Sequence, residues 1–483
     1  MNALVLCLAV PTAGAALILL LRGLPVLRDA ALVGTALSLF ATVLSLLPAL
    51  LAGANPATPA WTVLPGLDLQ LVLEPLGMLF ALVASGLWVV NALYSIGYMR
   101  ANEEPRQAPF HAWFALSLAA TMGIALAGNL FTLFLFYELL TLLTWPLVTH
   151  RRDAAAIAGG RTYLLWLVGG SLMLFLPAIA WIALVTGRLG FAPGGMLAGQ
   201  SDPSAIGVLL ALIVFGVGKA AVMPMHRWLP AAMVAPTPVS ALLHAVAVVK
   251  AGVFCVLKIV VLGLGVDTLA TTGAAGWLPY VAGTSVILAS VIALRQDDLK
   301  RRLAYSTVSQ LSYVVLAVSL LNGMAITAAA LHIAAHAVGK ITLFFVAGAI
   351  YTTEHRTRVS ELDGIGRRMP WTMTAFAIGA LSMIGVPPCA GFISKWFLVS
   401  GAIAAEQWFV LGVVAASTLL TAGYFLPILH AAFLRPAPAG VTSHGEAPAL
   451  MLGALVVTAG LTIGLFLYPA PVLTLARLFS GLT

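Results

Sequence analysis

Residues 218–250, GKAAVMPMHRWLPAAMVAPTPVSALLHAVAVVK, place two lysines and a histidine in segments that otherwise have the composition of membrane spans. Lys219 follows a long and mostly apolar run, and His244 and Lys250 lie within the next one. A charge at the centre of a bilayer costs about 2.5–3.5 kcal/mol on insertion scales. Repeated charges at this depth therefore favour a protein that moves charge across a membrane.

The composition of the whole chain fits an integral membrane protein. Of its 483 residues, 61% are hydrophobic and only 8% are charged, and the mean hydropathy is +1.05. Soluble domains carry about 25% charged residues. No polar block is long enough to form a separate soluble domain, so residues 1–483 are expected to form a single membrane domain.

The three cysteines, Cys7, Cys255 and Cys389, are scattered through apolar segments. They form no CxxC motif and no cluster, so disulfides, structural zinc and iron–sulfur ligation are not expected. The chain also contains no dinucleotide-binding glycine fingerprint and no Walker A motif. We therefore expect no cofactor, no metal site, no bound nucleotide and no nucleic-acid partner.

Apolar runs separated by proline, glycine and charged residues predict an all-α protein of about fourteen transmembrane helices. The thinnest separators are Gly128-Asn129 and Leu321-Asn322-Gly323. The expected spans are 2–21, 30–53, 74–98, 111–127, 129–149, 161–186, 206–227, 237–264, 277–294, 303–321, 324–353, 370–400, 404–434 and 447–475.

The distribution of basic residues predicts the orientation of these spans. If the N-terminus faces outside, most of the 24 lysines and arginines fall in the cytoplasmic loops, as the positive-inside rule requires. The charged stretch 295–310, RQDDLKRRLAYSTVSQ, is then cytoplasmic, with its Asp and Arg side chains paired locally. We expect a multi-pass protein of a bacterial inner membrane with both termini outside.

Ionisable residues within the spans of the first half are the main candidates for function. Glu138 lies well inside its span, where acidic residues are rare and are usually paired. Lys219 lies five residues before Pro224, which should break or kink the helix and free backbone carbonyls beside the lysine. A buried lysine close to a carboxylate can gain and lose protons. His244 and Lys250 would provide further proton-binding groups.

The second half contains a matching series of polar residues. His332, His336 and Lys340 recur at every fourth position and share one face of a helix. No third acidic or cysteine ligand accompanies the two histidines, so a proton relay is favoured over a zinc site. Lys258, near the outer end of its span, is expected to extend towards the membrane surface.

Lys395 follows a second helix break, at Pro387 and Pro388. Five helices separate the two broken spans, and interrupted helices at matching positions indicate an inverted-repeat transporter. An odd number of helices per repeat gives the two copies opposite orientations. The expected divisions are 1–110 for three N-terminal helices, 111–264 for the first repeat, 277–434 for the second, and 447–483 for the last helix.

Four stretches resemble a known family: residues 224–254, PMHRWLPAAMVAPTPVSALLHAVAVVKAGVF; 297–313, DDLKRRLAYSTVSQLSY; 331–348, LHIAAHAVGKITLFFVAG; and 385–398, GVPPCAGFISKWFL. They resemble the antiporter-like membrane subunits shared by respiratory complex I, membrane-bound hydrogenases and Mrp-type Na⁺/H⁺ antiporters. The resemblance extends from about Leu73 to Trp396, and LLHAVAVVKAGVF is most similar to the Mrp D subunit. It implies fourteen helices, two inverted five-helix repeats, and breaks in helices seven and twelve.

The resemblance also assigns roles to these residues. Glu138 and Lys219 would form the glutamate–lysine pair of the first half-channel. Lys250 would be the central connecting lysine, and Lys395 the lysine of the second broken helix. Four further residues would extend the polar axis between them: His244, His332, His336 and Lys340.

The implied function is proton translocation within a multisubunit Mrp-type Na⁺/H⁺ antiporter, by a transporter subunit without a catalytic site of its own. The alternative is a proton-pumping subunit of a complex I-type NADH:quinone oxidoreductase or a membrane-bound hydrogenase. A scaffold with a vestigial polar axis is the third reading. The expected partners are other membrane subunits, the lipid bilayer and protons. Whether Na⁺ crosses this chain stays open, because no oxygen cage for a cation can be read from the sequence.

Overall fold

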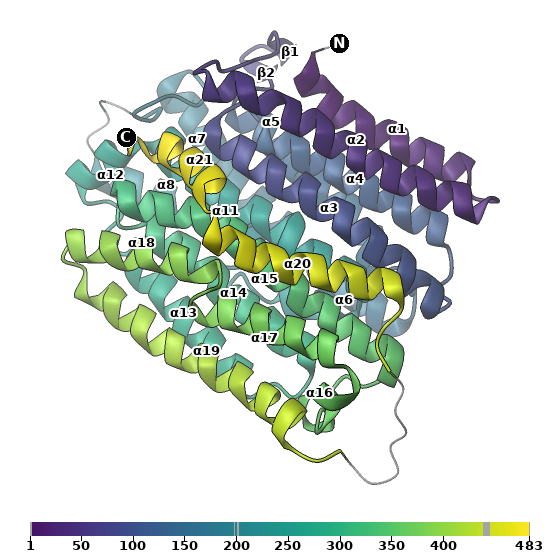
Figure 1. Ribbon diagram of the computed structural model, residues 1–483. Helices are drawn as coiled ribbons and strands as arrows, with labels where there is room; N and C mark the ends of the chain where they lie inside the picture. The colour runs from purple at the N-terminus through teal and green to yellow at the C-terminus, as the bar shows by residue number, and fades with distance from the viewer. Residues whose placement is uncertain (1, 198, 200–201, 438–444, 483) are drawn as a thin grey trace.

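The computed structural model describes residues 2–197, 199, 202–437 and 445–482 as a bundle of helices that share one general direction (Figure 1). The N-terminal part comprises α1 (Ala3–Leu20), α2 (Pro25–Leu51), β1 (Trp61–Leu64), β2 (Leu67–Leu69) and α3 (Pro75–Ala101). The two short strands pair antiparallel. They were not expected from the sequence.

Three segments of the first repeat are interrupted. Its elements are α4 (Gln107–Ala125), α5 (Leu130–Val148), α6 (Ala154–Gly170), η1 (Ser171–Phe175), α7 (Leu176–Thr186), α8 (Pro203–Gly216), η2 (Gly218–Ala220), α9 (Trp228–Ala231), η3 (Ala232–Val234), α10 (Thr237–Ala241), η4 (Leu242–Val246), α11 (Val248–Lys258), η5 (Ile259–Gly265) and α12 (Val266–Thr272). The segments α6–α7 and α10–α12 each continue through wider, π-helical turns.

The second repeat has simpler helices. It consists of α13 (Leu278–Leu294), α14 (Leu299–Val318), α15 (Gly323–Glu354), η6 (Val359–Glu361), α16 (Ile365–Arg368), α17 (Pro370–Ile384), α18 (Gly391–Ala404) and α19 (Trp408–Leu434). The chain continues with α20 (Ala449–Leu467) and α21 (Ala470–Ser480).

The helices account for all the expected spans. Within the described residues, ten helices are long and apolar enough to cross a membrane. The remaining expected spans correspond to α8 with its broken continuation, to α13, to α14, and to α17 with α18. Asn129 and Asn322 cap α5 and α15 by accepting hydrogen bonds from Thr132 N (2.7 Å) and Ala325 N (2.9 Å). Both thin separators are therefore true helix boundaries.

Some predicted boundaries were wrong. The span expected at 206–227 ends as a regular helix at Gly216, eight residues before Pro224. The last span, expected at 447–475, ends at Leu467, and α21 follows as a separate helix. The helix expected from 303 begins at Leu299, because the Asp298 carboxylate caps it by accepting from Arg301 N at 2.8 Å.

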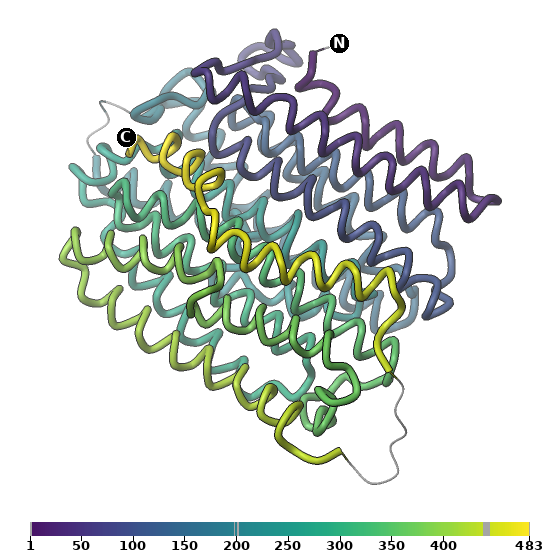
Figure 2. Tube along the Cα trace, viewed as in Figure 1, coloured from purple at the N-terminus to yellow at the C-terminus, as the bar shows by residue number. Residues whose placement is uncertain are grey.

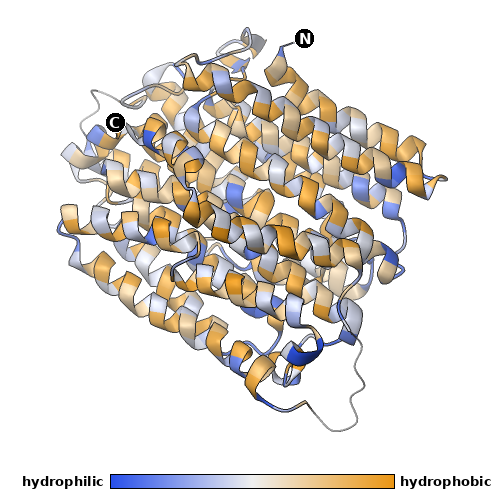
Figure 3. Ribbon diagram, in the orientation of Figure 1, coloured by the Kyte–Doolittle hydropathy of each residue, from blue (hydrophilic) through white to orange (hydrophobic). Residues whose placement is uncertain are grey.

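The surface has the character expected of a membrane protein. Hydrophobic residues cover the sides of the helices, and hydrophilic residues gather at the two ends of the bundle (Figure 3). Both chain termini lie towards the same end of the bundle (Figures 1 and 2). An even number of membrane spans places both termini on the same side.

Helix α15 is the centre of the bundle. It packs against α3, α10, α14, α17, α18, α20 and α21. Its most apolar window is completely buried. Alanines and glycines along it let these neighbours approach closely. Figure 2 shows α20, in yellow, lying across the bundle, where it contacts α3, α15 and α17. The histidines and the lysine of α15 are therefore held between both repeats.

Extended segments close the end of the bundle near the termini. Val72 N donates to Leu126 O at 2.7 Å, and Met196 N donates to Gly263 O at 2.6 Å. These bonds tie the segment after β2 to the end of α4, and the segment after α7 to η5. Backbone polar groups that would otherwise be unpaired near the membrane thus find partners within the chain.

Gly252 of α11 is required for the close approach of η2. A Cβ at this position would lie 2.2 Å from Ala220 N. We predict that Gly252→Ala lowers the free energy of unfolding of the purified protein by about 1–3 kcal/mol, because overpacking a core usually costs this much. Thermal unfolding measures the change. Gly453→Ala in α20, where a Cβ meets nothing within 4 Å, is the control. Equal stability of the two variants would contradict this packing.

Candidate functional site

Lys219 occupies the first helix break. It lies in η2, fully buried, and its Nζ donates to Tyr137 O at 2.7 Å and to Thr141 Oγ1 at 2.6 Å. The same Nζ lies 3.2 Å from the centre of the Tyr137 ring. The Gly218 carbonyl accepts from the Trp228 indole at 2.9 Å and from Ala221 N at 3.0 Å. The expected break is present, but the lysine bonds to α5 and not to its own carbonyls.

Glu138 does not form a direct ion pair with Lys219 among the described residues. The two groups lie within electrostatic reach of each other. Glu138 is half-buried, and its Oε1 is buried without a hydrogen-bond partner in the described part of the chain. The neighbouring side chains Leu135, Leu139 and Leu142 are exposed on the same helix. Glu138 thus lies between the Lys219 pocket and the lateral surface of the bundle.

Lys395 occupies the second break in a different manner. The Gly385 backbone, with φ of +87°, ends α17 and turns the chain away. Lys395 Nζ donates to the Ile384 carbonyl, which this turn frees, at 2.8 Å. It also donates to Thr418 Oγ1 at 3.3 Å. The proposed pairing of a lysine with the carbonyls of its own broken helix is therefore found here.

Lys250 and the α15 histidines lie in a continuous row. Lys250 Nζ is hydrogen-bonded to His336 Nδ1. The rings of His336 and His332 are 5.9 Å apart between centroids. His332 Nδ1 lies 2.9 Å from the hydroxyl of Ser394, the residue before Lys395. All of these side chains are buried, so a row of polar groups leads from the middle of the bundle to the second break.

Tyr313 of α14 completes the far end of this row. Its ring centroid lies 5.6 Å from that of His332 and 5.1 Å from Lys395 Nζ. Tyr313, Lys395, His332 and Ser394 lie around one gap that is too small to hold a water molecule. Tyr313 was not singled out from the sequence, because one aromatic residue in an apolar helix gives no signal of its own.

Lys340 and His244 lie beside the row and have different surroundings. Lys340 Nζ donates to Ser306 Oγ at 2.8 Å, and Ser306 in turn accepts from Tyr424 Oη at 3.0 Å. The His244 ring packs 4.6 Å from that of Phe344. Neither ring nitrogen of His244 has a hydrogen-bond partner within the described residues.

The prediction that Lys258 extends to the membrane surface was wrong. Lys258 is fully buried and pairs with Glu74 Oε2 at 2.8 Å. Its Nζ also donates to Ala127 O at 2.7 Å. The segments that close this end of the bundle cover it. Glu74 precedes Pro75 at an expected span boundary, and nothing in the sequence indicated that it would meet Lys258.

The charged stretch before α14 is also paired differently from the prediction. Asp297 accepts from the Ser360 hydroxyl at 2.8 Å and from Ser360 N at 3.0 Å, and not from a neighbouring arginine. The hydroxyl bond holds the pKa of the Asp297 carboxyl below its ordinary value. Lys300 donates to Ala235 O at 2.6 Å. This stretch therefore connects α14 to η6 and to the segment before α10.

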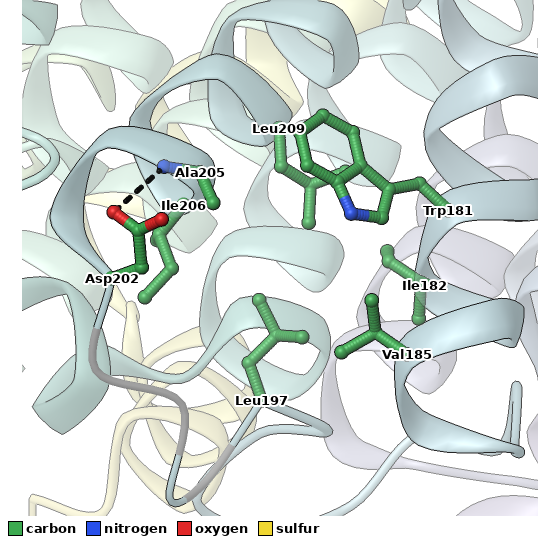
Figure 4. Close-up of a pocket in the computed structure, with 8 residues that line it drawn as sticks. All are labelled: Trp181, Ile182, Val185, Leu197, Asp202, Ala205, Ile206 and Leu209. Carbon is green, nitrogen blue, oxygen red and sulfur yellow. Dashed lines mark hydrogen bonds between the residues drawn. The ribbon is translucent and has the colours of Figure 1, made fainter.

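A separate apolar pocket lies at the start of α8 (Figure 4). Its volume is about 190 Å³. The one charged side chain drawn there, Asp202, caps α8 by accepting from Ser204 N at 3.0 Å and from Ala205 N at 3.4 Å. None of the residues of the polar axis lines this pocket.

The fold and its buried axis define the class of protein: a multi-pass membrane protein of two inverted repeats with a lysine at each helix break. Residues 127–421 match the family described as "NADH:quinone oxidoreductase/Mrp antiporter, TM". The chain belongs to this family of antiporter-like, proton-translocating subunits.

Individual relatives come from both kinds of complex. NADH-quinone oxidoreductase subunit N of Desulforudis audaxviator is 35% identical over 81% of this chain and 81% of its own length. Na⁺/H⁺ antiporter subunit A1 of Staphylococcus aureus is 33% identical over 75% of this chain, which spans only 46% of that subunit. A chain in the structure of the Mrp complex from Dietzia sp. shares the fold, with a TM-score of 0.87 at 23% identity, covering 99% of this chain and 96% of that one.

The Glu74–Lys258 pair yields a prediction about stability. Glu74→Gln leaves the fully buried Lys258 charge uncompensated, and removal of one partner of a buried pair costs about 3–5 kcal/mol. Lys258→Met should lower the free energy of unfolding by less than Glu74→Gln does. The Glu74 side chain is 18% exposed, so water can solvate its charge when Lys258 is removed. Thermal unfolding of the purified variants measures both. The double variant Glu74→Gln/Lys258→Met should be more stable than Glu74→Gln, and the opposite order would contradict the pairing.

Proposed function

We propose that this chain is the proton-translocating subunit of a multisubunit Mrp-type monovalent cation (Na⁺)/proton antiporter. One observation carries the proposal: Lys250, His336, His332 and Ser394 form a buried row that ends beside Lys395. Intramembrane ionisable groups are expensive to bury, and in membrane proteins they mark ion and proton pathways.

The row has the chemistry of a relay. A neutral His336 ring can accept a hydrogen bond at Nδ1 from the Lys250 ammonium. Transfer of that proton to the ring would leave the lysine amine neutral and the imidazole charged. The Nε2 atoms of His336 and His332 are buried without partners among the described residues. No hydrogen bond joins the two rings within the described residues, so a water between them would connect the two nitrogens. Each histidine can then accept a proton at one ring nitrogen and release a proton from the other, towards the next group in the row.

The first half would be coupled to this row by charge. When Lys219 is protonated, approach of the Glu138 carboxylate stabilises it, and separation of the two releases the proton. Two unit charges at 4 Å interact by about 4 kcal/mol at an effective dielectric constant of 20. That is enough to change the protonation of a neighbouring lysine. Lys219 lies close to α11, the helix that carries Lys250.

The arginine-rich end of the bundle would face the cytoplasm, with both termini outside. Arg151, Arg302 and Arg368 lie at or near helix ends there, and such a bias sets orientation in multi-pass proteins. The partners in the membrane would be the other subunits of the antiporter. The protons move through this chain, and Na⁺ is the cation that the complex exchanges for them.

A set of alanine variants tests this pathway. The rate of proton-coupled cation exchange in membrane vesicles should fall about 100-fold or more, because a positioned proton-transfer group contributes that much to a rate. This is expected of each of four variants: Lys219→Ala, Glu138→Ala, Lys250→Ala and His336→Ala. Subunit assembly should be retained, as judged by co-purification. Arg188→Ala, at an exposed loop position, should exchange normally. Retained exchange in both Lys219→Ala and Glu138→Ala would refute the mechanism.

A second function is favoured by the match to subunit N, which extends over 81% of both chains. In that case the same proton pathway would serve a redox-driven complex, whose cofactors must lie in other subunits. Affinity purification of the intact complex decides between the two. An Mrp-type antiporter should yield only further membrane subunits, whereas a redox complex would yield iron–sulfur proteins with visible absorbance.

A further inference from the structure

A cavity of about 170 Å³ opens at the arginine-rich end of the bundle, between α3, α10, α14 and α15. Three basic side chains from separate parts of the chain line it: Arg151, Lys300 and Arg356. Asp298 is the one acidic residue that lines it in the described part of the chain, and its carboxylate accepts from Arg301 N at 2.8 Å. The lining therefore carries more positive than negative charge. The proton relay described above uses none of these residues.

Lys300 is the basic group with the fewest partners. Its Nζ donates to Ala235 O at 2.6 Å, whereas an ammonium group can donate three hydrogen bonds. None of the ion pairs found among the described residues includes Lys300. A buried or partly buried charge is expensive without a partner of opposite sign. An anion in the cavity would supply that partner.

The two arginines of the cavity also retain donors for a ligand. Arg151 pairs with Glu104 at 3.0 Å. Arg356 Nε lies 3.5 Å from the Glu354 carboxylate, which also pairs with Arg368 at 2.6 Å. One carboxylate thus serves two guanidinium groups. Since each guanidinium has five N–H donors in a planar fork, both arginines can bind a further acceptor.

Hydroxyl groups add neutral donors to the same cavity. Tyr98 of α3 and Thr237 of α10 line it and are almost wholly buried. Tyr351 and Thr357 line it as well. Oxyanions such as phosphate accept hydrogen bonds from cationic and neutral donors alike, and those from arginine and lysine are the strong ones. The donor set therefore fits an anion with several oxygen atoms better than a single halide ion.

The size and position of the cavity restrict the ligand further. Its volume is close to that of an engineered cavity of about 150 Å³ that binds benzene, so a nucleotide is too large. The most apolar windows of α15 and of the α10–α12 segment are wholly or almost wholly buried. Lipid chains therefore do not reach these walls of the cavity, and the ligand should come from the aqueous phase.

We propose that this cavity is a binding site for a small, doubly charged oxyanion of the phosphate class. Arg151 belongs to the first repeat, and Lys300 and Arg356 belong to the second. A bound oxyanion would hydrogen-bond to groups of both repeats and hold them together at this end of the bundle. The site is separate from the proton relay, so its occupancy does not depend on the proposed function.

Thermal unfolding of the purified intact complex tests the site, with inorganic phosphate as the probe and chloride at equal ionic strength as the reference. Because a ligand that binds only the folded state stabilises it, phosphate should raise the unfolding temperature in a saturable manner. Lys300→Met and Arg356→Gln should each raise the phosphate concentration that gives half of this effect. The increase should be about tenfold or more, as expected when a hydrogen bond to a charged group is lost.

The matched control is Arg367→Gln. Arg367 is exposed near the same end of the bundle and does not line the cavity, so this variant should respond to phosphate as the unsubstituted chain does. Phosphate also stabilises proteins in general, because it is excluded from their surfaces. An equal rise of the unfolding temperature in all three variants would show only that general effect and would overturn the site. An equal rise in chloride would overturn it too.

A fourth variant keeps the test decisive if Lys300→Met or Arg356→Gln fails to assemble. Thr357→Glu places a carboxylate at the cavity, where it should take the place of the anion. It should raise the unfolding temperature in chloride and remove the specific response to phosphate. An unchanged response in this variant would contradict the site.

A lipid headgroup carries the same phosphate chemistry, so phosphatidylglycerol added to the detergent micelles forms a further arm of the experiment. Inorganic phosphate should stabilise the complex without it. Stabilisation by phosphatidylglycerol alone, lost in Lys300→Met, would show a lipid site and overturn the proposal of a soluble ligand. All of these measurements are made without transport, so their outcome is independent of the alanine variants that test the relay.

Discussion

The contact between Lys250 Nζ and His336 Nδ1 joins the two repeats of the bundle. Lys250 belongs to the first repeat and His336 to the second, and both side chains are buried. A lysine amine in such a position needs a partner, since burial of an unpaired charge is far more expensive than burial of a hydrogen-bonded group. The position of α15 between the repeats supplies that partner, and the rest of the polar row follows from the four-residue spacing along α15.

The buried lysines at the two helix breaks have different hydrogen-bond partners. Lys395 bonds to the carbonyl that its own broken helix frees, at Ile384. Lys219 donates to the Tyr137 carbonyl and the Thr141 hydroxyl of α5, while the Gly218 carbonyl accepts from the indole of Trp228 and from Ala221 N. The first lysine is therefore held beside the helix that carries Glu138. The second is held beside the histidine row. This difference gives the two half-channels distinct neighbours although they share one architecture.

The buried interior contains two kinds of polar group. In one kind, such as Glu74 with Lys258 or Lys340 with Ser306, every charge is matched by a nearby partner. In the other, including His244, Ser240 and Ser95, polar atoms are buried without protein partners among the described residues. The matched groups hold helices together. The unmatched groups leave buried polar atoms that bound water can satisfy.

The sequence alone determined the membrane spans, the two breaks and the face shared by His332, His336 and Lys340. These features depend on local composition, proline and helical periodicity, which act within a few turns of one helix. Only the tertiary structure decided which groups meet. It paired Lys258 with Glu74 and not with the membrane surface, bonded Lys219 to α5, and set Lys300 against Ala235. Contacts between residues far apart in the chain depend on how helices pack, and a single sequence carries no periodic signal for that packing.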